Sequence, residues 1–156
     1  MERDVFTYLV GGKAGEGVKK AGSAAANMFA GMGRNVFQMD DYPSLISGGH
    51  NFAVVSTAVR EVTSHYMTAD VVVALDDRSF RNHKEHVAEG GVMIFNSDDT
   101  ESEDGVGVPM TTMAEEYPNA GLRVGVSGIA ALCAAIGKSR GDLAEIIEQE
   151  YKRDLA

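Results

Sequence analysis

The sequence predicts an α/β fold, a three-layer α/β/α sandwich on a mostly parallel, mixed sheet. Short apolar runs alternate with stretches whose apolar residues recur at helical spacing. Residues 71–75 (VVVAL) are an unbroken apolar run, which is typical of a strand buried on both faces of a parallel sheet. Residues 52–58 and 59–64 are nearly continuous in strand character, which favours a long strand or an antiparallel hairpin. The sheet is therefore expected to be mixed.

Length and composition restrict the class of protein. The 156 residues suit one domain with one core, and a formal net charge of −9 argues against binding nucleic acid through its phosphates. The one cysteine, Cys133, lies in an apolar run, which predicts a buried thiol in a reducing compartment such as the cytoplasm. No stretch reaches the roughly 20 apolar residues of a membrane span, and the start of the chain is unlike a signal sequence. We therefore expect no membrane association.

The first expected element is a strand, a glycine turn and a helix at residues 5–18 (VFTYLVGGKAGEGV). A glycine turn lets the backbone approach a ligand, and the helix behind it points amide groups and its positive dipole end at that ligand, so an anion is the expected occupant. Gly17 is followed by Val18, which excludes a nucleotide triphosphatase loop, and Lys20 stands where the dinucleotide fingerprint needs a glycine. A tight turn without a ligand is the alternative. The glycines of the turn are Gly11, Gly12, Gly15 and Gly17.

A second strand is expected at residues 35–39, so the opening reads β-α-β with a right-handed parallel crossover. Residues 40–51 (DDYPSLISGGHN) contain proline, two adjacent glycines and several polar groups, which predicts a long loop of the kind that is often functional. In an open α/β sheet, ligands bind beyond the carboxyl ends of the strands. We therefore expect the two glycine loops, residues 11–17 and 42–51, to face each other.

A second β-α-β unit follows, with residues 71–75 as a central strand. Asp76 or Asp77 is expected to cap its helix, and residues 90–91 (Gly-Gly) to stop that helix before a strand at 92–95. Residues 96–104 carry five acidic and no apolar side chains, which predicts a solvated, mobile connection. A short strand is expected at 106–108 and one or two helical turns at 111–116.

Two helices end the chain. Residues 127–137 are apolar on nearly every side, which predicts a helix that is buried all round. Ser139, with Asp142 three residues later, then begins an amphipathic helix. The chain stops at Ala156 directly after that helix, so we expect the native polypeptide to be longer.

Catalytic or metal-binding side chains are not evident. Two histidines in the segment NHKEH could bind a metal, but the basic residues beside them and the lack of a third ligand favour a solvated helix face, so no metal site is predicted. There is no Gly-x-Ser-x-Gly elbow, and Ser47 has no evident base partner. Asp40 and Asp41 are interpreted as the polar start of a loop. The histidines are His50, His65, His83 and His86.

The order of these motifs resembles the gamma subunit or domain of the 2-oxoacid:ferredoxin oxidoreductases. The resemblance rests on GGKAGEGV after the first strand, YPSLISGGHN, FAVVSTAVREVTSH and ADVVVALDDRSF, and it extends over residues 6–151. Ala14 and Glu16 replace a glycine and a glutamine that are usual in that family, and Ser47 stands where arginine is common.

The resemblance implies a non-catalytic gamma domain, residues 1–156, of a complex that oxidatively decarboxylates a 2-oxoacid such as pyruvate or 2-oxoglutarate to acyl-coenzyme A and passes electrons to ferredoxin. In that family, thiamine diphosphate with Mg is held by the alpha and beta parts and iron–sulfur clusters by beta or delta parts, while the gamma part packs against them and helps to admit coenzyme A. This sequence has no thiamine-type Gly-Asp-Gly motif and no set of cluster cysteines, so the isolated chain is predicted to be inactive. Fused gamma-alpha polypeptides in the family suggest that the chain is the N-terminal part of such a subunit.

Seven residues are predicted to form the coenzyme A entrance, with Lys19 or Lys20 adding positive charge. A stand-alone nucleotide- or phosphate-binding regulatory module is the alternative function, and a structural assembly domain without a ligand is a third. The predicted binding residues are Gly12, Lys13, Gly15, Gly17, Ser47, Gly48 and Gly49.

Overall fold

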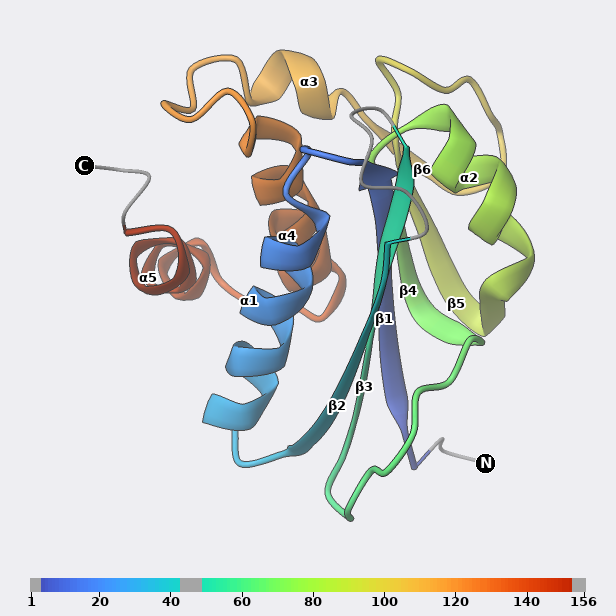
Figure 1. Ribbon diagram of the computed structural model, residues 1–156, viewed down its shortest axis with the longest axis vertical. Helices are drawn as coiled ribbons and strands as arrows, with labels where there is room; N and C mark the ends of the chain where they lie inside the picture. Colours follow the sequence, from blue (N-terminus) through green and yellow to red (C-terminus); the bar gives the residue numbers. More distant parts are fainter. Residues whose placement is uncertain (1–3, 43–48, 153–156) are drawn as a thin grey trace.

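The computed structural model describes residues 4–42 and 49–152, which form one mixed sheet with helices on both faces (Figure 1). Its strands are β1 (Phe6–Lys13), β2 (Asn35–Asp41), β3 (His50–Ala58), β4 (Ala69–Ala74), β5 (Val87–Asn96) and β6 (Val106–Val108). Its helices are α1 (Val18–Gly31), α2 (Asp77–His83), the 3-10 turn η1 (Lys84–His86), α3 (Met110–Met113), α4 (Arg123–Ala135) and α5 (Arg140–Glu150).

The strand order across the sheet is β2-β3-β1-β4-β5-β6. Strands β1, β4, β5 and β6 are parallel neighbours, and β3 is antiparallel to both β1 and β2. The prediction of a mostly parallel, mixed sheet is confirmed, with β1 and β4 in its interior. Strand β2 runs in the same direction as β1, as the β-α-β pattern predicted, but β3 lies between them because it pairs with both. Residues 59–64 are outside the strands, so their predicted strand character is wrong, both as a continuation of residues 52–58 and as a hairpin with them.

Helices α1, α4 and α5 lie on one face of the sheet and α2 lies on the other, which gives the predicted three layers (Figure 1). Successive side chains of each strand point to opposite faces of the sheet. Tyr8 and Val10 of β1 pack in the core under α1 and α4, whereas Leu9 packs on the α2 side. None of the helices among the described residues has the length and apolar character to cross a membrane.

Two glycines predicted to stop a helix lie inside β5 instead. Helix α2 ends at His83, and η1 leads directly into β5 at Val87. Gly90 has a φ of 77°, and a Cβ on Gly91 would lie 2.8 Å from the backbone oxygen of Asp70. The register between β4 and β5 shifts at this point. The two glycines therefore allow an irregularity in the pairing of β4 with β5. In the sequence, a glycine pair at such an irregularity looks the same as one that ends a helix.

Helix α4 is buried on one side only, so the prediction of burial all round is wrong. Ile129 and Leu132 are fully buried against the sheet, and Cys133 is buried as expected, but Ala134 is exposed. A helix this rich in small apolar residues has no polar side to mark its orientation. Its other side lines an apolar groove of about 280 Å³ together with β5, β6 and α3. The lining residues are Ile94, Val106, Val108, Met113, Ser127, Ala130, Ala131 and Ala134.

The acidic connection after β5 is mostly exposed, as predicted, and two of its side chains bond to the starts of helices. Buried Asn96 donates to the Leu75 carbonyl and accepts from the Met110 amide. Asp98 accepts from the Thr112 amide at 2.8 Å. Asp99 likewise accepts from the Asp77 amide at 2.9 Å, so two of the acidic residues satisfy amides at helix starts. The two predicted caps are confirmed: Asp76 accepts from the Ser79 amide, and a capping box begins α5.

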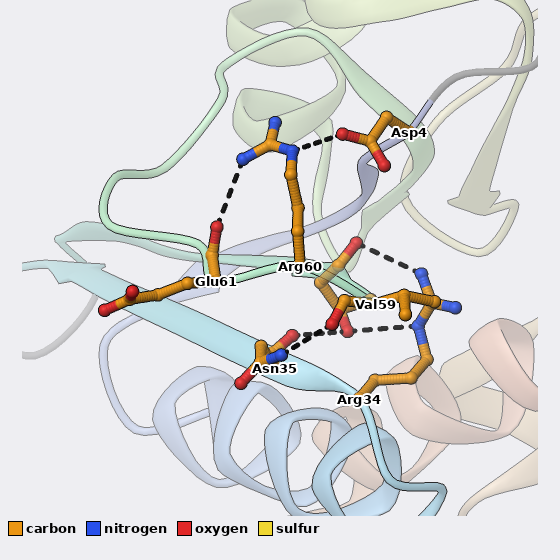
Figure 2. Close-up of polar contacts among 7 residues, drawn as sticks. Asp4, Arg34, Asn35, Val59, Arg60 and Glu61 are labelled. Atoms are coloured by element: carbon orange, nitrogen blue, oxygen red, sulfur yellow. Dashed lines mark hydrogen bonds and ion pairs between the residues drawn. The ribbon is translucent and has the colours of Figure 1, made fainter.

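The opposite end of β3 is fixed by side chains that bond across the β2–β3 pair (Figure 2). Arg34 donates to the Thr57 hydroxyl at 3.2 Å and to the Thr57 carbonyl at 3.3 Å. Asn35 donates to the Val59 carbonyl at 2.7 Å. These bonds set the β2–β3 register at the edge of the sheet away from the glycine loops.

Candidate functional site

The glycine turn is shorter than the sequence predicted, because β1 continues to Lys13 and includes Gly11 and Gly12. The turn proper is residues 14–17. The Glu16 amide donates to the Lys13 carbonyl at 3.1 Å, and the Glu16 carboxylate accepts from the Lys13 amide at 2.7 Å. Gly15 and Gly17 have φ values of 95° and 80°, a region that side chains disfavour, so both are required by the turn.

Gly11 and Gly12 serve close packing instead. A Cβ on Gly11 would lie 3.0 Å from the Ser79 hydroxyl on the α2 face. A Cβ on Gly12 would lie 2.8 Å from the Glu16 carboxylate on the α1 face. The lack of side chains at the end of β1 therefore lets α2 and the turn approach the sheet from opposite sides.

The two glycine loops meet, as the sequence predicted. Strands β1 and β3 pair to their ends, with Lys13 opposite His50, and the Ala14 amide donates to the Gly49 carbonyl at 2.6 Å. Gly49 thus lies beside the turn. Ser47 and Gly48, the other predicted loop residues, lie outside the described residues.

The start of α1 is covered by the start of α4. A Cβ on Gly125 would lie 2.4 Å from the Glu16 carbonyl oxygen, and a Cβ on Gly17 would lie 2.8 Å from the Leu122 side chain. Nothing lies within 4 Å of the Cβ position of Gly15, which is exposed. A ligand would therefore reach the turn from the Gly15 side.

Charges around the turn are mixed. Lys13 and Lys19 are exposed, whereas the Lys20 amine lies 5.0 Å from the centre of the Tyr151 ring. Burial raises the pKa of the Glu16 carboxyl, and the nearby Asp76 and Asp99 raise it further, while the hydrogen bond from the Lys13 amide opposes the shift. The Glu16 carboxylate thus accepts the hydrogen bond of the Lys13 amide, which a bound anion would otherwise accept. The sequence did not reveal this contact.

A polar cluster that the sequence missed lies on the α2 side of the same edge. The Ser79 hydroxyl donates to Asp76 at 2.5 Å and lies 3.4 Å from Nδ1 of His50. Nε2 of His50 is 2.9 Å from Nε2 of His83, and Nδ1 of His83 is 3.1 Å from Nδ1 of His86. We call His50, His83 and His86 the histidine cluster.

The histidine cluster corrects the prediction of a solvated helix face. His83 is only 3% exposed, and burial lowers its pKa to about 4, with His50 and His86 acting in the same direction and Asp76 against it. The spacing of Ser79, His83 and His86 at i, i+4 and i+7 was an available signal of one shared side. His50 could not be added from sequence, because only the β1–β3 pairing brings it there.

Similarity to known proteins agrees with this architecture. The 2-oxoglutarate synthase subunit KorC of Archaeoglobus fulgidus is 26% identical over 154 residues, which are 98% of this chain and 82% of that protein. Subunit alpha of the 2-oxoacid:ferredoxin oxidoreductase 2 of Aeropyrum pernix is 28% identical over 91 residues, which are 58% of this chain and only 14% of that protein. The chain therefore spans a small part of that subunit.

Solved structures share the fold. The 2-oxoglutarate:ferredoxin oxidoreductase of Magnetococcus marinus, with 2-oxoglutarate, coenzyme A and succinyl-CoA bound, matches with a TM-score of 0.76 and 22% identity over 97% of this chain and 28% of that chain. The keto/oxoacid ferredoxin oxidoreductase gamma subunit of Geobacter sulfurreducens matches with a TM-score of 0.74 and 18% identity over 94% of this chain and 85% of that chain. A family model described as pyruvate ferredoxin/flavodoxin oxidoreductase matches residues 7–156. The chain thus belongs to the pyruvate ferredoxin/flavodoxin oxidoreductase family and has the fold of its gamma subunits.

Proposed function

We propose that residues 1–156 form one gamma-type domain of a 2-oxoacid:ferredoxin oxidoreductase complex. The observation that carries the proposal is the family match over residues 7–156, together with similarity over 82% and 85% of two separate subunits. In the proposed complex, alpha and beta parts, with delta parts where these are separate, hold thiamine diphosphate with Mg and the iron–sulfur clusters. Those parts oxidise the 2-oxoacid and reduce ferredoxin.

The chain's own residues support a non-catalytic role. Cys133 is the only cysteine, it is buried, and burial raises the pKa of its thiol. Its sulfur lies 4.0 Å from the Met28 sulfur inside the core between α1 and α4. A lone buried thiol with a raised pKa suits neither a cluster ligand nor a redox-active group. Turnover would then depend on partner subunits.

Two kinds of relative support two arrangements of the polypeptide. The match to alpha subunits supports the N-terminal part of a fused gamma-alpha chain, and the match to KorC supports a separate gamma subunit. The mass of the native polypeptide, measured after purification from its host, distinguishes them. Fusion and a cytoplasmic location both stay predictions.

Purification from the host tests the assignment itself. We expect the chain to co-purify with thiamine diphosphate and with the visible absorbance of iron–sulfur clusters, and the isolated 156-residue chain to show no 2-oxoacid-dependent reduction of an acceptor. A monomer that binds a nucleotide without partner subunits would support the regulatory-module alternative. Turnover by the isolated chain would contradict a non-catalytic role.

The finer proposal is that the edge at Gly15 and Gly49 helps to admit coenzyme A. Lys13 and Lys19 are exposed, the Gly15 side of the turn is open, and a helix begins directly behind it, all of which favour a phosphate. The bound coenzyme A in the Magnetococcus enzyme makes such a ligand plausible for the family. The Glu16 carboxylate opposes an anion, so the phosphate would bind through the lysines and the outer amides of the turn.

A matched pair of variants tests this role in the reconstituted complex. Gly15 and Gly33 both have positive φ, at 95° and 79°, and both have open space at the Cβ position, but they lie at opposite ends of α1. Valine at either position should reduce stability similarly, by about 1 to 3 kcal/mol. Only Gly15→Val should raise the KM for coenzyme A, because only that side chain obstructs the turn. Equal KM values in both variants would refute coenzyme A access at this edge.

A further inference from the structure

The histidine cluster joins two segments that are distant in the sequence. His50 is the first residue of β3, His83 ends α2, and His86 ends η1. The rings also pack as an aromatic group, with centroids of His50 and His83 5.0 Å apart and those of Phe52 and His83 4.8 Å apart. The cluster therefore connects the start of β3 to α2 by hydrogen bonds and by ring contact.

One set of neutral tautomers satisfies the whole cluster. Asp76 accepts the Ser79 proton, so the Ser79 oxygen can accept from Nδ1–H of His50. His50 then accepts at Nε2 from Nε2–H of His83, and His83 accepts at Nδ1 from Nδ1–H of His86. Each ring carries one proton, and each of these three histidine contacts joins one donor to one acceptor.

A metal does not explain the arrangement. His83 directs its two ring nitrogens to different partners, so the three rings do not converge on one point. Across residues 4–42 and 49–152, no group of three histidine, cysteine, aspartate or glutamate side chains is placed to hold a metal ion. Neutral hydrogen bonding is the arrangement that the geometry supports.

We propose that the histidine cluster is an acid-released latch that holds the start of β3 on α2. The cluster can take up one added proton by shifting tautomers, but once His50 and His83 are both cationic, two N–H donors face each other 2.9 Å apart. In the same way, two Nδ1–H donors face each other across the His83–His86 contact once both of those rings are cationic. Acid therefore replaces hydrogen bonds with repulsion at a buried position.

The charged groups around the cluster do not cancel this effect. For His50, burial lowers the pKa most, Arg78 of α2 lowers it too, and Asp76 and Asp41 raise it. For His83, burial and its two histidine neighbours lower the pKa to about 4, against Asp76 alone. Gly11 of β1, which has no charged group, lies beside His83, and Lys84 and Glu85 of η1 are exposed. The latch is therefore closed at neutral pH.

Release of His50 from α2 would weaken the contact between the two glycine loops at Ala14 and Gly49. His50 pairs with Lys13, and the preceding Gly49 accepts the Ala14 amide. Release of His50 from α2 removes the side-chain contacts that hold this corner on the α2 side. This consequence holds whichever ligand the edge receives, and so it does not rest on the proposed function.

Nuclear magnetic resonance on the full chain tests the latch directly. Ring-nitrogen spectra should show His83 neutral at pH 6 with its proton on Nε2. At pH 7 they should show the His50 proton on Nδ1. The hydrogen-exchange protection factor of the Ala14 amide should fall about 20-fold from pH 7 to pH 5, if the open state titrates as an ordinary histidine and the closed one near 4. The amide of Val72, buried in β4, should keep its protection.

Two glutamine variants complete the test. His83→Gln should make the Ala14 protection factor independent of pH over this range. His65→Gln, the same change in the segment between β3 and β4, should leave the fall intact. Constant Ala14 protection in the wild-type chain, or a His83 ring that is already cationic at pH 6, would overturn the proposal. The wild-type ring spectra decide the matter even if His83→Gln does not fold.

Discussion

The two faces of the sheet differ in both size and chemistry. Under α1, α4 and α5 the described residues form a core of twenty buried apolar residues, whereas the cluster on the α2 side has eight. The α2 side instead buries polar groups: Thr7 bonds Ser56 at 3.1 Å, and Asp76, Ser79 and His83 form the network beside Gly11. Apolar burial is insensitive to pH, and a buried histidine network is not. The faces should therefore respond differently to mutation and to acid.

The largest expected effect is on the face with three helices. Leu132 is fully buried in α4, so Leu132→Ala should lower the free energy of unfolding by about 3 kcal/mol through lost burial and a cavity. Urea denaturation at pH 7 and at pH 5 should give the same loss, because no histidine is involved. The control is Ala134→Ser on the exposed side of α4, expected within about 0.5 kcal/mol of wild type. A loss that depends strongly on pH would break the comparison between faces.

The next effect belongs to the α2 face. The folded-state pKa of His83 is lowered from 6.5 to about 4, so between these values the folded chain binds fewer protons than the unfolded chain. Stability from this group is thus present above pH 6.5 and is lost as the pH falls toward 4. From pH 7 to pH 4.5 the loss should be about 2 kcal/mol. The difference between wild type and His83→Gln in urea measures it, because the contributions of carboxylates cancel. If the difference in free energy of unfolding between wild type and His83→Gln is the same at pH 7 and at pH 4.5, the lowered pKa of His83 does not contribute to stability as stated.

The smallest expected effect is a gain in stability, on replacement of Glu16, whereas the two preceding effects are losses. Burial raises the pKa of Glu16, so its charged form is disfavoured in the folded state, and its stabilising contribution is lost as the pH rises through the folded-state pKa. Glu16→Gln keeps an acceptor for the Lys13 amide without the charge, and at pH 7 it should raise stability by less than about 1 kcal/mol. Glu145→Gln on the exposed side of α5 is the control in the same denaturation assay. A clear loss of stability in Glu16→Gln would show that its charge supports the turn.

The candidate site was predictable only in part. Gly15 and Gly17 were expected in the turn and do form it, with positive φ. The meeting of the two loops followed from the rule on the carboxyl ends of strands. The same reasoning placed Gly11 and Gly12 in the turn, because a sequence does not distinguish a glycine that bends the chain from one that makes room for α2. It also did not show that Glu16 would fold back onto the Lys13 amide.

The sequence by itself determined the order of strands and helices, though not all their bounds, and also the caps at Asp76 and Ser139 and the family. These follow from local periodicity and from motifs in series. Tertiary structure alone decided that β3 lies between β1 and β2, that one side of α4 stays open, and that His50 meets His83. That last contact joins the side chains of residues 33 positions apart, which the pairing of β3 with β1 brings together. Local patterns carry no information on such contacts, because the pairing free energy depends on which strand edges meet.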